Sequence, residues 1–321
     1  MSSQERYVNE LISVAQELQR DGASVGDLKI ATGALHEMRE AFKVFAAYRG
    51  VRKVSAFGSA RTREGDPVFK LAEEFARRIA DSGYMLITGA GPGIMEACQR
   101  GAGRDRSFGV NIRLPWEQQA NTIISGDPKL MSFRYFFARK LFFLKEADAV
   151  VLFPGGFGTL DEGFETLTLL QTGKTRPVPL VLLDRPRGTY WKTWQRYVET
   201  QILRRHMVEK EDFALYKVTD NVDEAVEEIT RFHRVYHSSR YVREQFVIRI
   251  ARPLPSAFVD ALATEFDDII TGGGITQRAA LRAEREEVDI AHLPRLAFHF
   301  DRIHFGRLRL LIDRLNQAPA V

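Results

Sequence analysis

The chain has 321 residues, 45% hydrophobic and 27% charged, so it can bury a large core and is longer than one typical domain. Its 46 basic and 42 acidic residues leave a net charge of only +4, which is too small to favour nucleic-acid binding. Cys98 is the single cysteine, which excludes an intramolecular disulfide and any zinc site with more than one thiolate.

The sequence shows no signal peptide and no membrane-spanning segment. The first six residues lack the basic and then apolar order of a secretory signal peptide. No apolar run reaches the length that spans a bilayer. We therefore expect a cytoplasmic protein with neither a membrane nor a nucleic acid as its partner.

Residues 1–50 are predicted to form a helical extension. Apolar side chains recur there at helical spacing in two groups, which are Leu11, Val14 and Leu18, and then Leu35, Met38, Phe42 and Phe45.

Residues 51–235 predict an α/β domain. Short apolar runs predict strands at 54–57, 84–88, 108–112, 149–153 and 178–183. Amphipathic segments predict helices at 67–82, 94–102, 132–147, 159–171, 190–203 and 222–234. Alternation of strand and helix favours a Rossmann-like, doubly wound parallel sheet with helices on both faces.

Residues 236–321 predict a small α+β domain. Arginine stays frequent there although no lysine follows Lys217. Strands are expected at 246–250 and 296–300, and helices at 256–266 and 305–316. This domain could regulate, dimerise or narrow substrate choice, and the sequence leaves these roles open.

Two glycine-rich segments, 88–96 (TGAGPGIME) and 154–162 (PGGFGTLDE), each follow a predicted strand and lead into a helix. Glycine lets the backbone approach a ligand closely, and a helix N-terminus suits a phosphate. Glycine-rich turns also occur without a ligand, but two on one sheet favour an anion or nucleotide site.

Two familiar nucleotide motifs are broken. The dinucleotide fingerprint needs a third glycine where Ile94 stands, and a P-loop ending at Gly173-Lys174-Thr175 needs a glycine where Thr168 stands. The run Gly272–Gly274 is predicted to be a loop.

Glu162 has two interpretations. Thr159 and Glu162 have the spacing of a capping box at a helix start, which would be worth about 1 kcal/mol. A carboxylate at this edge of the sheet could instead stabilise positive charge on a sugar ring or activate water.

Arg139 lies in the segment 131–144, which is apolar nearly all round and therefore predicted to be buried. Burying an unpaired charge is costly, so Arg139 should emerge into a cleft or meet an anion. Its long side chain could also reach the surface by snorkelling.

Together these residues resemble the LONELY GUY (LOG) family over residues 50–220. The family motif Pro-Gly-Gly-x-Gly-Thr-x-x-Glu matches at every fixed position from Pro154 to Glu162, and its preceding Arg-Lys pair matches Arg139-Lys140. The segments 57–61 (FGSAR) and 91–97 (GPGIMEA) are also similar to the family.

The resemblance implies hydrolysis of the N-glycosidic bond of a nucleoside 5′-monophosphate, such as AMP or a cytokinin riboside monophosphate, without a metal or other cofactor. It implies that Glu162 and Arg139 are catalytic. Substrate-binding residues implied by the same motifs are Ser59, Gly91, Gly93, Lys140, Gly156, Phe157, Gly158, Thr159 and Thr168.

The resemblance also implies a homodimer or a higher homo-oligomer. Asn121 stands where a common family member has glutamate, which puts contacts with base or ribose there in doubt. Some relatives carry an old label of lysine decarboxylase, but no motif of a pyridoxal phosphate enzyme is found. A non-catalytic nucleotide sensor and a ribosyl-phosphate transferase remain alternatives, and the proton donor to the leaving base is not identified.

Overall fold

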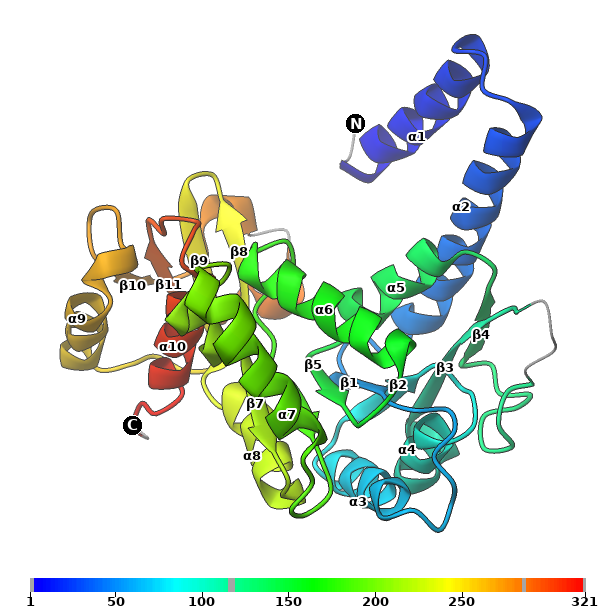
Figure 1. Cartoon of the computed structure of the whole chain (residues 1–321). Coiled ribbons are helices and arrows are strands. Elements are labelled where there is room, and N and C mark those ends of the chain that lie inside the picture. Colours follow the sequence, from blue (N-terminus) through cyan, green and yellow to red (C-terminus); the bar gives the residue numbers. More distant parts are fainter. Residues whose placement is uncertain (1–2, 115–118, 285–286, 320–321) are drawn as a thin grey trace.

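A computed structural model describes residues 3–114, 119–284 and 287–319 and contains two β-sheets (Figure 1). The larger sheet has seven parallel strands in the order β4-β3-β2-β1-β5-β6-β7. These strands are β1 (Lys53–Phe57), β2 (Met85–Thr88), β3 (Ser107–Ile112), β4 (Leu130–Phe133), β5 (Ala149–Leu152), β6 (Leu180–Leu183) and β7 (Tyr216–Thr219).

The strand order places a crevice at the middle of this sheet. The chain builds outward from β1 to β4 and then returns to place β5 on the other side of β1. Strand order reverses between β1 and β5, where the loops at their carboxyl ends diverge and doubly wound folds bind ligands. The predicted Rossmann-like fold is therefore confirmed.

Helices cover both faces of the sheet because the strands alternate their side chains between two cores. One core contains Phe57, Ile87 and Leu152. It is covered by α2 (Val25–Ala46), α5 (Phe136–Lys145), α6 (Phe157–Gln171) and α7 (Tyr190–Tyr197). The other core contains Val54 and Val151. It is covered by α3 (Pro67–Asp81), α4 (Ile94–Ala102) and α8 (Val222–Phe232).

Several predicted boundaries differ from the structure. The helix predicted over 132–147 is wrong at its start, because residues 130–133 form edge strand β4 beside β3 and α5 begins only at Phe136. Local apolarity does not distinguish a buried strand from a buried helix. Strand β7 was not predicted. The helix predicted over 190–203 is α7 followed by a π-helical turn, η2 (Val198–Ile202), and the 3₁₀ turn η3 (Leu203–Arg205).

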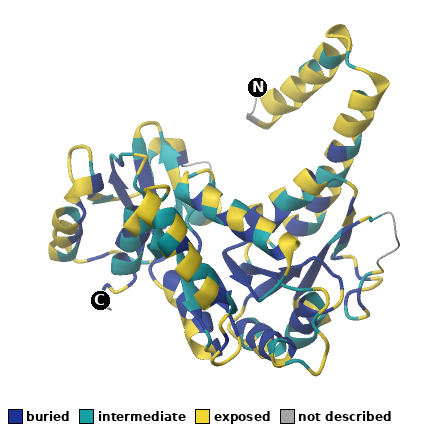
Figure 2. Ribbon diagram, in the orientation of Figure 1, coloured by how far each residue is buried: buried dark blue, intermediate teal, exposed yellow. Residues whose placement is uncertain are grey.

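The N-terminal residues form α1 (Ser3–Arg20) and α2, as the apolar spacing predicts. The end of α2 packs on the sheet, where Phe45 stacks on Phe108 with ring centroids 4.7 Å apart. Figures 1 and 2 show α1 extending from the body of the molecule with most of its residues exposed.

The C-terminal residues form a four-stranded antiparallel sheet in the order β10-β11-β9-β8 with its own core. Its elements are β8 (Tyr236–Val242), β9 (Gln245–Ile250), α9 (Ser256–Glu265), β10 (Thr276–Arg278), β11 (Arg295–Phe298) and α10 (Phe305–Leu315). The α+β character is as predicted, whereas β8 and β10 were not predicted. Gly272–Gly274 lie outside helices and strands, as predicted for a loop.

Helix α10 packs against η4 (Lys210–Leu215), a 3₁₀ segment that precedes β7. A side chain at Gly306 would lie 2.3 Å from the carbonyl oxygen of Glu211, so glycine permits this close approach. Arg309 also forms a buried ion pair with Glu228 of α8. The C-terminal sheet is therefore attached to the parallel sheet through α10.

Among the described helices, none combines the length and the apolar character needed to cross a bilayer.

Candidate functional site

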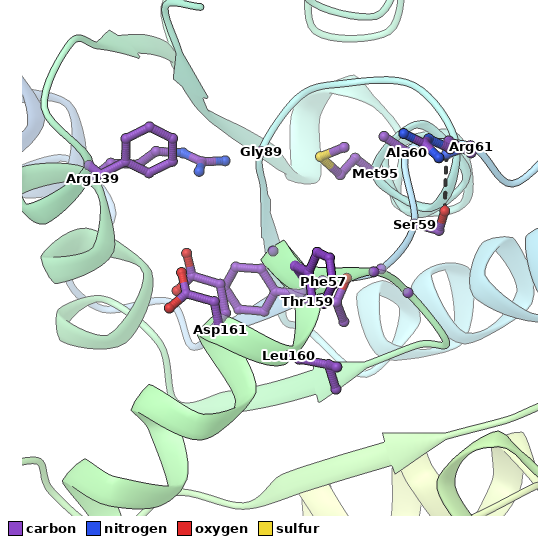
Figure 3. A pocket seen from close by; sticks show the side chains of 17 residues that line it. Phe57, Ser59, Ala60, Arg61, Gly89, Met95, Arg139, Thr159, Leu160 and Asp161 are labelled. Carbon is purple, nitrogen blue, oxygen red and sulfur yellow. Dashed lines mark hydrogen bonds between the residues drawn. The ribbon is translucent and has the colours of Figure 1, made fainter. Parts of the chain in front are cut away.

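A cavity of about 720 Å³ opens at the carboxyl ends of β1 and β5 (Figure 3). Its walls come from the loop after β1, from Gly89 after β2, from Met95 of α4, from Phe136 and Arg139 of α5, and from residues 155–162. The cavity therefore occupies the switch point of the sheet, where the two glycine-rich segments were predicted to bind a ligand.

The turn after β5 brings the N-terminus of α6 to this cavity. Helix α6 begins at Phe157 with Gly156 as its N-cap residue. Thr159 lies within the first turn, with its N–H 3.1 Å from the oxygen of Gly156, so the capping-box interpretation of Thr159 and Glu162 is wrong. The first amides of a helix lack internal acceptors, so this turn offers donors to an anion.

Gly155 explains why this turn needs glycine. A side chain there would lie 2.1 Å from Thr159 Oγ1 and 3.0 Å from the amide nitrogen of Ser59. Ser59 donates its N–H to the oxygen of Pro154 at 3.3 Å, and Tyr190 donates its hydroxyl to the oxygen of Gly155 at 2.6 Å. The loops after β1 and β5 are thus held against each other at the cavity.

The turn after β2 lines the cavity through Gly89, whereas its later glycines support the site. A side chain at Gly93, where φ is +70°, would lie 2.4 Å from the carbonyl oxygen of Ser59. Ile94 donates its N–H to the same oxygen at 3.1 Å. Gly91 and Gly93 are not among the lining residues. Gly93 packs against the Ser59 loop instead, and the oxygen of Gly91 accepts a hydrogen bond from Asn121.

Asn121 has a structural explanation in this chain. Its side-chain amide donates to the oxygen of Gly91 at 2.9 Å and to Gln99 Oε1 at 2.7 Å. Its backbone N–H donates to the oxygen of Ala90 at 2.8 Å. Asn121 is buried and fixes the turn after β2, including Ala90, whose φ is +59°.

Arg139 emerges from α5 into the cavity, so the snorkelling alternative is wrong (Figure 3). Its Nε donates to the oxygen of Val110 at 2.9 Å, and its guanidinium lies 4.9 Å from the ring centroid of Phe143. A side chain at Gly89 would lie 2.6 Å from a terminal guanidinium nitrogen. Burial lowers the pKa of Arg139, while the charge of Glu162 acts to raise it.

Glu162 lines the same cavity from α6 and is only 6% exposed. Burial raises the pKa of its carboxyl group above the usual value, and the nearby charges of Lys140 and Arg139 oppose that rise. A buried carboxylate beside two cations can stabilise positive charge that develops in the cavity.

Lys140 points to α6 rather than into the cavity. Its Nζ lies 2.8 Å from Asp161, 3.4 Å from Glu162 and 2.5 Å from Glu165. Burial acts to lower the pKa of Lys140, but its hydrogen bonds to Asp161 and Glu165 outweigh this effect and raise it. The structure therefore places Lys140 as a partner of Glu162, not among the lining residues.

Thr168 is not brought to this cavity. Its hydroxyl donates to the oxygen of Phe164 at 2.8 Å within α6. Thr168 is six positions after Glu162, which places it about 240° around the helix from Glu162. Of the predicted substrate-binding residues, those that line the cavity are Ser59, Gly156, Phe157, Gly158 and Thr159.

Several residues that line the cavity were not predicted. Arg61 and Met95 lie within the family-like segments but were not singled out, Asp161 adjoins Glu162, and Phe136 lies three residues before Arg139. Tyr190, which supports Gly155, is distant in sequence and carried no motif. The charged lining combines Arg61 and Arg139 with Asp161 and Glu162, which suits a ligand that is anionic at one end and becomes cationic elsewhere.

Within the described parts of the chain, no three His, Cys, Asp or Glu side chains are grouped so that they could hold a metal ion.

Residues 94–229 match a family model described as "possible lysine decarboxylase". No curated protein matches the chain. Solved structures match at low TM-scores. A structural-genomics target, TM1055, has a TM-score of 0.39 and 24% identity, covering 56% of this chain and 99% of that chain. The molybdenum cofactor binding protein of Rippkaea orientalis has a TM-score of 0.38 and 18% identity, covering 56% of this chain and 93% of that chain.

The molybdenum cofactor carrier protein of Chlamydomonas reinhardtii gives a TM-score of 0.38 and 20% identity, covering 56% of this chain and 96% of that chain. At these values, nothing about the ligand of this cavity follows from any of the three structures.

Proposed function

We propose that the protein hydrolyses the N-glycosidic bond of a nucleoside 5′-monophosphate, because its motifs resemble those of the LOG family and residues 94–229 match the family model described as "possible lysine decarboxylase". One observation carries the proposal: Arg139 of α5 and Glu162 of α6 line a single cavity at the switch point of the Rossmann-like sheet. The N-terminus of α6 borders the same cavity and supplies an anion site.

The substrate would contact the cationic and the acidic parts of the cavity. The phosphate would accept hydrogen bonds from backbone amides at the start of α6, next to the Gly155–Gly156 turn. Arg139 would hold the phosphate or the ribose through its terminal nitrogens, because its Nε is already bonded to Val110. The ribose would then lie near Glu162.

In the reaction, the bond between ribose C1′ and the base nitrogen breaks, and water forms a new bond to C1′. Departure of the base leaves oxocarbenium character on the ribose, which the Glu162 carboxylate would stabilise. Glu162 would also orient water or accept its proton. The leaving base takes up a proton, and the products are free base and ribose 5-phosphate.

The matched family model is described as "possible lysine decarboxylase", and the cavity does not favour that chemistry. A pyridoxal phosphate enzyme needs a lysine amine to form its Schiff base. No lysine is among the described residues that line the cavity, and Lys140 is paired with three carboxylates on α6.

The proposal is tested by incubating the purified protein with a panel of nucleoside 5′-monophosphates and following the products by mass spectrometry. We expect equal amounts of free base and ribose 5-phosphate from at least one member of the panel. Binding without turnover would instead support a nucleotide sensor. Transfer of ribosyl phosphate to an added acceptor, with none released to water, would support a transferase.

Lys140→Met should change the pH dependence of the reaction. Glu162 must be ionised, so activity should fall as the pH drops through its pKa, which burial holds above the usual glutamate value. Lys140 opposes that rise, and its removal should raise the pKa further. The acid limb of kcat/KM should therefore move to higher pH.

The matched control for this experiment is Lys145→Met, on the same helix, because Lys145 pairs with Glu146 and does not line the cavity. Lys140→Arg should retain most of the wild-type profile, since it keeps the positive charge beside Glu162. An acid limb that stays in place, or moves to lower pH, in a folded Lys140→Met protein would contradict the role given to Lys140.

We also propose that the protein is at least a homodimer through the face that carries α5. Phe136, Phe137 and Leu141 of α5 are 53%, 59% and 44% exposed. Phe42 of α2 is also exposed, and its ring centroid lies 5.2 Å from that of Phe142 of α5. Solvent-exposed aromatic side chains gathered on one face are typical of an interaction surface. Because Phe136 also lines the cavity, this interface would lie next to the site.

Light scattering at micromolar concentration should give at least twice the mass of the chain. Phe137→Glu, which lies outside the cavity lining, should shift the protein toward a monomer because a charge would be buried at the interface. The control is Ile303→Glu, at an exposed apolar residue near the C-terminal sheet. A monomeric wild-type protein would contradict this assembly.

A further inference from the structure

A second cavity, of about 140 Å³, lies along α6 on the side away from Glu162. Phe164, Leu167, Thr168 and Gln171 line it with the spacing i, i+3, i+4 and i+7, which defines one face of a helix. Glu162 is about 200° around the helix from Phe164, so α6 separates the two cavities. The opposite wall comes from α7, η2, η4 and β7.

Aromatic rings form much of the lining of this cavity. Trp194 and Tyr216 meet edge to face with ring centroids 5.3 Å apart. Phe213 lies 5.8 Å from Tyr216, and Phe164 lies 6.1 Å from Trp194, both measured between ring centroids. The π-helical turn η2 contributes Val198 and Ile202. Such turns interrupt α-helices frequently at functional sites.

Asp212 is the charged residue among those lining this cavity. Its Oδ2 accepts hydrogen bonds from Gln171 Nε2 at 2.6 Å and from the N–H of Glu209 at 3.0 Å. It forms no ion pair with any side chain in the described ranges, and no arginine, lysine or histidine from these ranges lines the cavity. The acidic side chain of Asp212 therefore has no cationic partner among the described residues at an aromatic, otherwise uncharged cavity.

We propose that this cavity binds a small organic cation with an apolar body, of the alkylammonium or arylammonium class. The ammonium group would pair with Asp212 and lie against aromatic rings, whose faces attract cations. The apolar body would replace water along Leu167, Val198 and Ile202. The volume suits a ligand of one ring or a short branched chain.

Two buried polar atoms define the competing ligand class. Trp194 Nε1 and Tyr216 Oη have no hydrogen-bond partner among the described residues. Both can donate, so by themselves they would favour a neutral ligand with an acceptor atom. Both atoms are shielded from water, whereas Asp212 is partly exposed, so the carboxylate is the more accessible recognition group.

The proposal does not rest on the proposed hydrolysis, because the second cavity shares no residue with the one that contains Glu162. Its position does connect two parts of the molecule. Asp212 and Phe213 belong to η4, and α10 of the C-terminal region packs on η4 through Gly306. A bound cation would therefore contact the segment that joins the C-terminal sheet to the parallel sheet.

The test is calorimetric titration of the full-length protein with benzylamine and, separately, with benzyl alcohol at neutral pH. The two probes have nearly the same size, but only benzylamine is a cation. We expect benzylamine to bind roughly tenfold or more tightly than benzyl alcohol. A tenfold difference in affinity is the size expected from a single favourable contact of the cation. Equal affinities, or tighter binding of the alcohol, would overturn the proposal in favour of a neutral ligand.

Substitutions in the cavity lining test whether benzylamine binds there. Asp212→Asn should remove the preference for benzylamine, while the control Glu211→Gln, also on η4 but not in the lining, should retain it. Ile202→Trp should fill the partly exposed edge of the cavity and abolish binding of both probes. Binding of benzylamine that survives both Asp212→Asn and Ile202→Trp, or no binding of it to the wild-type protein at millimolar concentration, would overturn the proposal.

Discussion

Glu162→Gln is expected to lower kcat for hydrolysis of a nucleoside 5′-monophosphate by roughly 100-fold or more, the scale for a positioned acid–base group. Glutamine keeps the shape of the side chain but cannot carry the negative charge that would stabilise the ribose cation. KM should change much less, because the phosphate contacts at the start of α6 remain. Steady-state kinetics with the best substrate of the panel measures both constants.

The same substitution should leave the fold intact. Glu162 is buried, and burial already opposes its ionised form, so a neutral amide removes an unfavourable desolvation. Lys140 keeps two carboxylate partners, Asp161 and Glu165. Glu165→Gln is the matched control, because it removes another partner of Lys140 outside the cavity lining. A Glu162→Gln protein with normal kcat would show that this carboxylate is not catalytic.

Arg139→Ala is expected to reduce kcat/KM by roughly 100- to 1,000-fold, similar to the loss of one preorganised donor in an active site. Arg139 forms no ion pair with a side chain in the described ranges, so its removal should affect the thermal midpoint much less than the activity. Arg134→Ala, an exposed residue just before α5 and outside the cavity, is the control.

Lysine should replace Arg139 poorly. The guanidinium bonds Val110 through Nε and still has two terminal nitrogens for a ligand. A lysine has one nitrogen and cannot reproduce this planar arrangement. If Arg139→Lys matched the wild-type kcat/KM, a simple positive charge would be sufficient, and the role assigned to the guanidinium would be incorrect.

The sequence predicted where the two glycine-rich turns lie, because turns at the carboxyl ends of parallel strands have a fixed place in the sheet. The segments around Gly93 and Gly155 therefore converge at the switch point between β1 and β5. Arg139 was expected to emerge from an apolar helix, and it does so because α5 packs its other side against the sheet.

The positions of Thr159, Thr168 and Lys140 depend on where each helix begins and how it is rotated, which motif spacing does not specify. The helix start at Phe157 places Thr159 inside α6, so a capping-box spacing was present without the capping geometry. Rotation along the same helix directs Thr168 to the second cavity. Lys140 is adjacent to Arg139 in sequence, but it projects at a different angle and meets the carboxylates of α6.

The elements missed by the sequence analysis share one property. β4, β7, β8 and β10 lie at the edges of their sheets, where fewer side chains are buried and the apolar signal is weak. The existence of β4, β7 and β10 also depends on hydrogen bonds to a strand that is distant in sequence, such as the pairing of Gly109 with Leu130.

The most direct test of the account is a crystal structure of the Glu162→Gln protein with AMP, or with the best-bound member of the nucleotide panel. Slow turnover should preserve the intact nucleotide. We predict the phosphate at the N-terminus of α6, a terminal nitrogen of Arg139 on the phosphate or ribose, and ribose C1′ facing residue 162. A nucleotide that binds elsewhere, or that lies here with its ribose turned away from residue 162, would contradict the account.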